Sequence, residues 1–232
     1  MNTKKKAVVI GATGNLGSAI VAALEKAGYE IDKTWIGAGH PDATLPSSYA
    51  NLPSRIDLAV YAAGTNVVKP VHELTEKEWD EVMDVNVRGA FLLARAAFQG
   101  LKAARGTFVT ISSINSVFPY PNRALYCTSK AALEGLTTQL AVEWGKHGIS
   151  THCIRLGPLS KLMKATTANA KDPVALEGIL TAIKRRMPAH ELIPPEAVAA
   201  YIVHLAGGGA RWVTGAVIDF DAGYTLNIYP LL

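Results

Sequence analysis

Two patterns of apolar residues alternate along this chain. Short runs of apolar, often β-branched residues occupy 7–10, 29–36, 55–64, 107–113, 150–156 and 213–223. Such runs are typical of strands buried on both faces, whereas the stretches between them repeat apolar residues with helical spacing. This alternation predicts an α/β fold in three layers, with a parallel, doubly wound sheet of six or seven strands and helices on both faces.

Helices are predicted over 19–28, 75–93, 126–145 and 195–205. The stretch between the second strand and residue 42 is too short for a helix, so we expect a shortened second crossover. No linker or internal repeat divides the chain, which predicts a single domain over 1–232. In 159–195 six basic residues outnumber the acidic ones, a composition that fits a mobile substrate lid or an ordinary pair of solvated helices.

A glycine-rich turn follows the first strand and leads into a helix. Gly11 would allow the tight turn, Gly14 would let the backbone approach a pyrophosphate, and Gly17 would let the helix pack closely. The helix N-terminus favours the phosphate charge. This order predicts a Rossmann-like dinucleotide site, and a tight turn that binds nothing is the alternative. The candidate cofactor-binding residues here are Gly11, Thr13, Gly14, Asn15, Leu16 and Gly17.

Residues 37–40 should choose between NAD and NADP, because a position about 20 residues beyond the glycines contacts the adenosine ribose. This stretch, Gly-Ala-Gly-His, offers neither a carboxylate for the 2′-hydroxyl nor an arginine for a 2′-phosphate. The sequence therefore leaves NADP or NAD open. We lean to NADP, since no acidic residue would repel its additional phosphate.

Tyr126 and Lys130 lie four residues apart in a helix-forming stretch. Residues with this spacing share one helix face, so both side chains can point into one cleft. A nearby ammonium group favours the phenolate, and we therefore expect Lys130 to lower the pKa of Tyr126 and make it a proton donor and acceptor near neutral pH. An ordinary tyrosine and lysine on the surface of an amphipathic helix is the alternative.

Further polar or small residues interrupt the apolar segments. Asn86 lies within an apolar helix, where a buried amide needs partners; it either serves the site or ties the helix to a neighbouring strand. Ser113 ends a strand at the sheet edge where ligands bind in such folds, although a serine there can also form a turn. Ala62, Ala63 and Gly64 end another strand and leave room for a flat ring, although a glycine that simply ends a strand explains this segment equally or better when it is taken alone.

Composition narrows the function classes. Apolar residues make up 49% of the chain and charged residues 18%, which fits a well-buried core. The net charge of +4 is spread along the chain without a basic run interleaved with aromatics, so nucleic-acid binding is not indicated. Cys127 and Cys153 lack partners at metal-ligand or disulfide-framework spacing. The apolar run after the basic start is too short for a signal or membrane segment, and we expect a cytoplasmic protein.

Taken together, these segments resemble the short-chain dehydrogenase/reductase family over 7–223. Each matching motif is a weak signal alone, whereas their order and spacing are specific. The matching pieces are the glycine turn, Ala62-Ala63-Gly64, Asn86-Val87-Arg88-Gly89, Ser113, Tyr126-x-x-x-Lys130, Gly157, Val213-Thr214-Gly215 and Asp221-Ala222-Gly223. The resemblance implies an NAD(P)-dependent oxidoreductase that interconverts a ketone and a secondary alcohol, in the manner of 3-oxoacyl-thioester or biosynthetic ketone reductases.

The resemblance also assigns roles to residues. Tyr126 would be the general acid in carbonyl reduction, Ser113 would hydrogen-bond the substrate oxygen, and Lys130 would hold the nicotinamide ribose. Asn86 would connect Lys130 to solvent through a water. Asn86, Tyr126 and Lys130 are thus candidates for both catalysis and cofactor binding, and the resemblance adds further cofactor contacts at Asp42, Ala62, Ala63, Gly64, Gly157 and Ser160.

Four positions depart from the family pattern. Asn15 replaces a glycine, Tyr61 replaces an asparagine, Leu156 replaces a proline, and Lys161 replaces a threonine that contacts the nicotinamide. The changes at Leu156 and Lys161 keep open the alternative of a catalytically silent dinucleotide-binding sensor or scaffold, and an epimerase or dehydratase with a transient hydride step is a further alternative within the family. The implied partners are a small carbonyl or alcohol substrate and further copies of the chain, as a homodimer or homotetramer through the later helices, with no nucleic acid, membrane or metal.

Overall fold

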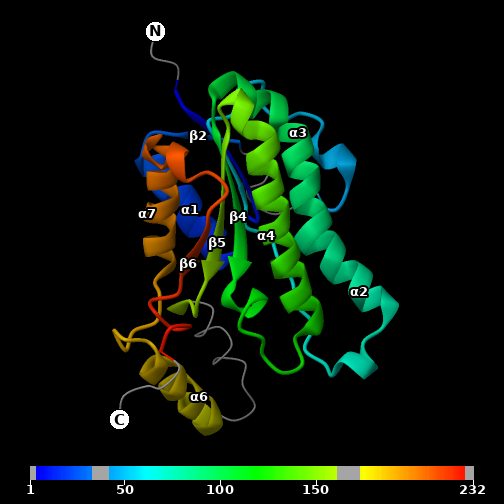
Figure 1. The fold of residues 1–232 in the computed structure, drawn as a ribbon, viewed down its shortest axis with the longest axis vertical. Helices are drawn as coiled ribbons and strands as arrows, with labels where there is room; N and C mark the ends of the chain where they lie inside the picture. The colour runs from blue at the N-terminus through cyan, green and yellow to red at the C-terminus, as the bar shows by residue number, and fades with distance from the viewer. Residues whose placement is uncertain (1–3, 33–41, 161–172, 228–232) are drawn as a thin grey trace.

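The six strands of the described residues form one parallel sheet in the order β2-β1-β3-β4-β5-β6 (Figure 1). The computed structural model describes residues 4–32, 42–160 and 173–227. The strands are β1 (Lys6–Ile10), β2 (Glu30–Ile31), β3 (Leu58–Tyr61), β4 (Thr107–Ser113), β5 (Ser150–Leu156) and β6 (Val217–Phe220). The predicted doubly wound, parallel sheet is confirmed.

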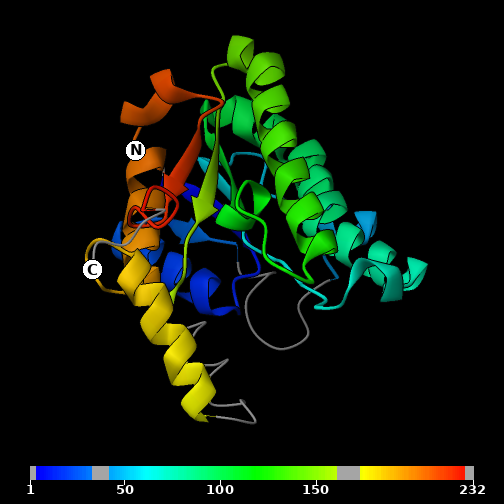
Figure 2. The same cartoon turned by 60° about the horizontal axis from the view of Figure 1, so that its bottom comes forward.

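Helices cover both faces of this sheet (Figures 1 and 2). One face carries α1 (Asn15–Lys26) and α7 (Pro195–Ala206), and the other carries α3 (Gly89–Ala104) and α4 (Ala124–Trp144), with α2 (Glu76–Met83) beside them. Successive residues of β1 serve the two faces in turn: Val9 joins the core under α1 and α7, whereas Val8 and Ile10 join the core under α3 and α4.

The strand order reverses between β1 and β3, because β2 lies on one side of β1 and all later strands lie on the other. In open parallel sheets ligands bind beyond the carboxyl ends of the strands at such a switch point. The glycine turn after β1 and the small residues after β3 both lie there. Helix α6 (Pro173–Arg186) also lies beyond this end of the sheet, on the side of α7 (Figures 1 and 2).

Several boundaries differ from the predictions. The second strand ends at Ile31 in the sheet, and the following residues 33–41 lie outside the described part of the chain. Residues 42–57 contain a 3-10 helix at Pro46–Tyr49 and no α-helix, in keeping with the expected short crossover. The last strand starts at Val217 rather than 213, because Gly209–Val213 forms a 3-10 helix and Gly215 has a positive φ of 82°.

The helix predicted over 75–93 is interrupted. α2 begins with a capping box between Thr75 and Glu78, and Asp84–Arg88 then forms a π-helix before α3 continues to Ala104. The extra residue of a π-turn leaves no mark in the apolar spacing, and such turns often mark functional positions. Within the described residues, no helix is both long and apolar enough to span a membrane.

Candidate active site

The glycine turn packs tightly between β1, β3 and α1. Gly11 has a φ of +82°, and a Cβ atom there would lie 2.6 Å from the backbone nitrogen of Ala63. A Cβ atom on Gly17 would lie 2.0 Å from the carbonyl oxygen of Gly11. These two positions admit only glycine, and the turn therefore brings the start of α1 against the end of β3.

The N-terminus of α1 has the properties of an anion site. Its N-cap residue, Gly14, supplies no side-chain cap, and no acidic residue lies in the first turn. Thr13, Gly14 and Asn15 are exposed, while Leu16 and Gly17 pack inward. The first amides of the helix thus face outward with a favourable dipole, which fits the pyrophosphate of a dinucleotide.

Asn86 lies in the π-helix and is wholly buried. Its Oδ1 accepts from the backbone nitrogen of Thr65 at 2.7 Å, and its Nδ2 donates to the Thr65 carbonyl and to Ser129 Oγ, both at 2.9 Å. The amide therefore ties the π-helix to the loop after β3 and to α4. Its connection to solvent stays a prediction.

Gly64 joins this cluster to Lys130. A Cβ atom on Gly64 would lie 3.3 Å from Lys130 Nζ and 3.5 Å from Asn86 Oδ1. Lys130 is 4% exposed, and its Nζ donates to the carbonyl of Ile111 in β4 at 2.8 Å. Burial lowers the pKa of Lys130 to about 8, so its ammonium group is less favoured than in solution.

Lys130 Nζ lies 5.4 Å from the centre of the Tyr126 ring, and the Ser113 side chain is near enough to act on the pKa of Tyr126. We expected Lys130 to lower the pKa of Tyr126. The structure corrects this: burial raises that pKa, and the side chain of Ser113 and the charge of Arg123 offset the rise only in part. The predicted pair is adjacent, but its protonation is controlled mainly by burial.

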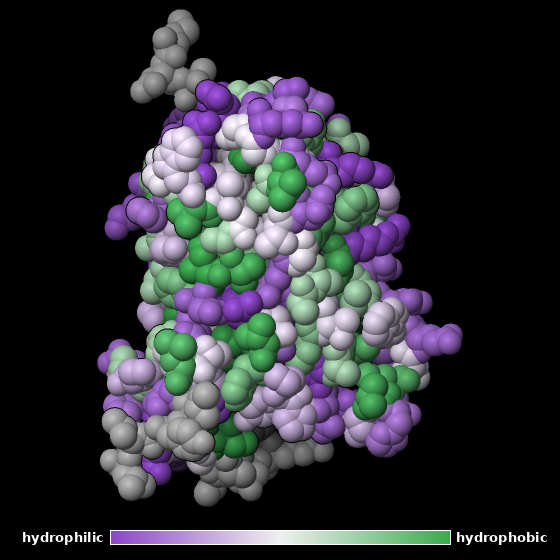
Figure 3. Space-filling model, viewed as in Figure 1, coloured by the Kyte–Doolittle hydropathy of each residue, from purple (hydrophilic) through white to green (hydrophobic). Residues whose placement is uncertain are grey.

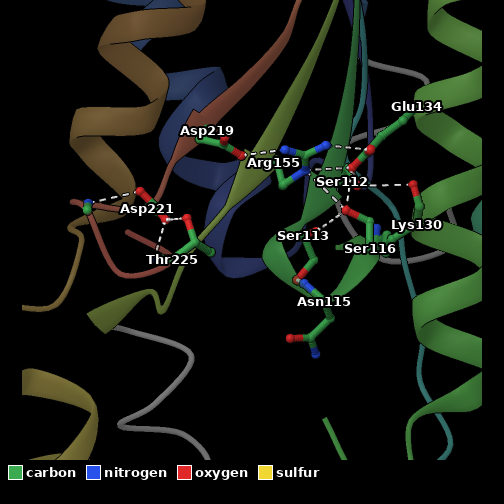
Figure 4. A network of polar contacts seen from close by, with 11 residues as sticks. Ser112, Ser113, Asn115, Ser116, Lys130, Glu134, Arg155, Asp219, Asp221 and Thr225 are labelled. Carbon is green, nitrogen blue, oxygen red and sulfur yellow. Dashed lines mark hydrogen bonds and ion pairs between the residues drawn. The ribbon is translucent and has the colours of Figure 1, made fainter. Parts of the chain in front are cut away.

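A polar network that sequence analysis missed lies beside this site (Figure 4). Arg155 donates to both carboxylate oxygens of Glu134, at 3.0 and 2.7 Å, and to Asp219 Oδ1 at 2.7 Å. Ser112 Oγ contacts the same carboxylate at 2.8 Å and the Lys130 carbonyl at 3.0 Å. Two signals could have indicated it: a charged residue within the apolar run of β5, and a glutamate one helical turn beyond Lys130.

Ser113 is joined to this network through the turn that follows it. Ser116 Oγ bonds Glu134 and donates to the Ser113 carbonyl at 2.8 Å, and Ser113 Oγ accepts from the Asn115 backbone at 3.2 Å. The hydroxyl of Ser113 is thereby placed by β4, by the 3-10 turn Ile114–Ser116 and indirectly by Glu134.

Gly157 packs on the segment after β6, because a Cβ atom there would lie 2.7 Å from Asp221 Cα. Asp221 is itself buried and accepts from Gly223 N and from Thr225 N, at 2.9 and 2.8 Å. The next residues close a loop: Leu159 and Ile193 form a parallel bridge, and Ser160 N donates to the Ile193 carbonyl at 2.9 Å. The two ends of the expected lid therefore meet.

The remaining candidate cofactor residues are placed as follows. Asp42 Oδ1 accepts from the backbone and hydroxyl of Thr44, both at 2.8 Å, in the short crossover. Ala62 N donates to the Ile10 carbonyl at 2.9 Å, so Ala62 and Ala63 line the glycine turn. Residues 37–40 and Lys161 lie outside the described part of the chain.

Comparison with known proteins finds similar oxidoreductases. Residues 43–225 match the family model described as enoyl-(acyl carrier protein) reductase. An uncharacterized oxidoreductase of Mycobacterium tuberculosis is 31% identical over 95% of this chain and 91% of its own length. A 3beta-hydroxysteroid dehydrogenase of Mediterraneibacter gnavus is 28% identical over 94% of this chain and 85% of its own length.

Solved structures have a similar fold. A candidate 2-deoxy-D-gluconate 3-dehydrogenase from Agrobacterium tumefaciens, with bound NADP, has a TM-score of 0.82 and 30% identity over 96% of both chains. The aldohexose dehydrogenase of Thermoplasma acidophilum has a TM-score of 0.85 and covers 99% of this chain and 97% of its own. At 22% identity the second likeness concerns the fold alone.

Proposed function

The chain belongs to the short-chain dehydrogenase/reductase family of NAD(P)-dependent oxidoreductases, and on that premise we propose that it interconverts a ketone and a secondary alcohol. The observation that carries the proposal is the position of Lys130, whose Nζ lies 5.4 Å from the centre of the Tyr126 ring and 3.3 Å from where a Cβ atom on Gly64 would lie. Gly64 links this cluster to the loop after β3, and that loop begins against the glycine turn. A proton donor and a dinucleotide cradle would thus meet at one edge of the sheet.

The residues divide the work as follows. Tyr126, whose raised pKa keeps it protonated near neutrality, would give its proton to the substrate oxygen during reduction. Ser113 would hydrogen-bond the same oxygen as negative charge develops on it. Lys130 would hold the cofactor ribose, and Asn86 fixes the loop that passes Lys130. When bound, the dinucleotide would supply or accept the hydride.

We propose NADP as the preferred cofactor. The tight cradle of Gly11 and Gly17 and the uncapped start of α1 fit the pyrophosphate. The sequence at 37–40 contains no acidic residue against a 2′-phosphate, and the 30% identical Agrobacterium relative was solved with NADP. The adenosine end would lie near Asp42.

Two measurements test the reaction and its rivals. NADPH should raise the melting temperature more than NADH at equal concentration, because binding to the folded state stabilises it. A panel of ketones with the preferred cofactor should then show net oxidation of NADPH. Binding without turnover would favour a silent sensor or scaffold, and product formation without net cofactor use would favour an epimerase or dehydratase.

We further propose an anionic substrate, because Arg186 lies unneutralised at the substrate end of the sheet. Its guanidinium lies 4.2 Å from the ring centre of Phe118 and 4.8 Å from that of Tyr224, and Nε donates to the Tyr224 carbonyl at 3.1 Å. Within the described residues no carboxylate pairs with it. Phe118 N in turn donates to the carbonyl of Ile114, the residue after Ser113.

Acetoacetate and its methyl ester test this charge, since they share the ketone. Arg186→Gln should raise the KM for acetoacetate by about tenfold or more, the value of a charge-assisted hydrogen bond, and leave the KM for the ester unchanged. Arg185→Gln, which removes an exposed neighbouring arginine, is the control and should affect neither. Equal effects on both substrates would refute the anionic assignment and leave the ketone reaction intact.

We also propose a substrate lid and a homo-oligomer. The meeting of Leu159 and Ile193 supports a lid over 159–195, of which 161–172 lie outside the described residues.

Apolar side chains form patches on the face that carries α4 and β6 (Figure 3), and Val142 and Trp212 are 79% and 88% exposed. These patches support a homodimer or homotetramer, which analytical ultracentrifugation would test. The free thiols of Cys127 and Cys153 suit the proposed cytoplasmic location.

A further inference from the structure

The π-helix Asp84–Arg88 needs a reason to persist inside an otherwise α-helical run. Its defining bond runs from the Gly89 backbone nitrogen to the Asp84 carbonyl, five residues back. The additional residue rotates the chain so that the side chain of Asn86 reaches Thr65 and Ser129. A regular α-helix would be favoured unless contacts from outside the helix select the π form.

Tyr61 supplies such a contact. It is the last residue of β3, it is 0% exposed, and its hydroxyl donates to the carbonyl of Val85 inside the π-helix. Gly89 accommodates the phenol, because a Cβ atom on Gly89 would lie 2.0 Å from the Tyr61 hydroxyl oxygen. Burial and the nearby Tyr49 and Asp42 raise the pKa of Tyr61 well above its ordinary value, so it stays a donor across the usable pH range.

A second phenol contacts the residue that follows the π-helix. The Tyr49 hydroxyl oxygen lies 2.8 Å from the Ala43 carbonyl oxygen and 3.2 Å from the Gly89 carbonyl oxygen, so its single proton is shared between these two acceptors. It contacts the residue after the π-helix rather than the residue beside Asn86. Tyr49 therefore offers a matched control: a buried tyrosine in the same core whose hydroxyl does not contact Val85.

We propose that Tyr61 is a positioning residue, whose hydroxyl selects the π-helix and thereby places Asn86 against the loop that borders Lys130. The proposal rests on the proposed reaction. The family pattern has an asparagine at this position, whereas here a phenol occupies it and joins β3 to the π-helix. Asn86 and Tyr61 then act as one unit, and their loss should not be independent.

A double-mutant cycle in kcat tests this coupling, with the ketone that the wild type reduces fastest and with saturating cofactor. Tyr61→Phe keeps the ring and deletes the hydroxyl; it should lower kcat on the order of tenfold, since a buried carbonyl loses its partner, and leave the KM for the cofactor unchanged. Asn86→Ala should lower kcat at least as much. The double variant should match Asn86→Ala alone, and Tyr49→Phe should stay near wild type.

The proposal would be overturned if the decreases in kcat caused by Tyr61→Phe and Asn86→Ala multiply in the double variant. A Tyr61→Phe variant with wild-type kcat would also overturn it. If Tyr61→Phe is destabilised, hydrogen exchange followed by mass spectrometry distinguishes a local effect from a global one. Tyr61→Phe should accelerate exchange over 84–89 and leave β4 and β5 protected, whereas acceleration throughout the sheet would show a merely structural role. An inactive wild type or an active Asn86→Ala would instead count against the proposed reaction.

Discussion

Lys130 and Glu134 lie four residues apart on α4, but their surroundings stabilise the ionised form of the side chain to different extents. Glu134 accepts from Arg155 through both oxygens and also bonds two serines, which together hold its pKa below the ordinary value despite partial burial. Lys130 is more deeply buried, its Nζ donates to one backbone carbonyl, and its pKa falls to about 8. One group is held ionised, and the other is close to losing its proton.

The difference separates two uses of a buried charge. A carboxylate with several donors is fixed in one state and can join β4, β5, β6 and α4 at the edge of the sheet (Figure 4). An amine with few partners responds to a ligand that brings charge or hydroxyl groups beside it. The site therefore combines a rigid frame with a titratable group only one helical turn away.

The largest expected effect concerns the phenol beside Lys130. Tyr126→Phe should lower kcat by about 10²–10⁴-fold, the usual contribution of a general acid, with a far smaller effect on cofactor affinity and melting temperature. Steady-state kinetics and NADPH fluorescence titration would measure both. Tyr120→Phe removes an exposed phenol from the neighbouring loop and serves as the control. Activity retained in Tyr126→Phe would exclude the acid role.

The next effect is a pH dependence of stability from Lys130. Its pKa lies near 8 in the folded protein against an ordinary 10.5, so the unfolded chain holds more protons between these values. The free energy of unfolding should therefore rise with pH from about 8 to 10.5, by roughly 3 kcal/mol relative to Lys130→Met. Urea unfolding of both proteins at several pH values measures this slope. The same pH dependence of the free energy of unfolding in both proteins would show that the pKa of Lys130 is not lowered in the folded state.

A smaller effect should come from the frame. Glu134→Gln leaves Arg155 with Asp219 as its one carboxylate partner among the described residues and should lower the free energy of unfolding by about 2–3 kcal/mol, somewhat less than for a fully buried pair. Activity should fall far less than in Tyr126→Phe. Glu81→Gln, which breaks an exposed pair with Lys77, should cost about 0.5 kcal/mol or less. A loss of kcat as large as that of Tyr126→Phe would merge the two regions into one functional unit.

The apolar runs and short motifs of the sequence predicted the strands and most of the candidate site residues. β4 and β5 match the predicted bounds at both ends, because their β-branched runs are closed by glycine or serine. The candidate residues Asn86, Ser113, Tyr126 and Lys130 also come from motifs, and the structure brings them together although their roles stay predictions. Strand ends set by a positive φ, as at Gly215, were not visible in the apolar pattern.

The features that the sequence did not predict depend on contacts between segments that are distant along the chain. Arg155 meets Glu134 across 21 positions, and Tyr61 meets Val85 across 24. The expected influence of Lys130 on the Tyr126 pKa was wrong in its net direction, since spacing along a helix indicates proximity but not the extent of burial. The interruption of the long helix has the same origin, because its cause lies in β3.

The bridge between Leu159 and Ile193 has an evolutionary consequence. A segment whose two ends are already joined can be exchanged for a longer, shorter or differently charged one with little change in the entropic cost of closure, since that cost changes slowly with length. Chimaeras that transplant 161–192 from a relative should therefore keep the host's cofactor preference and acquire the donor's choice of substrate.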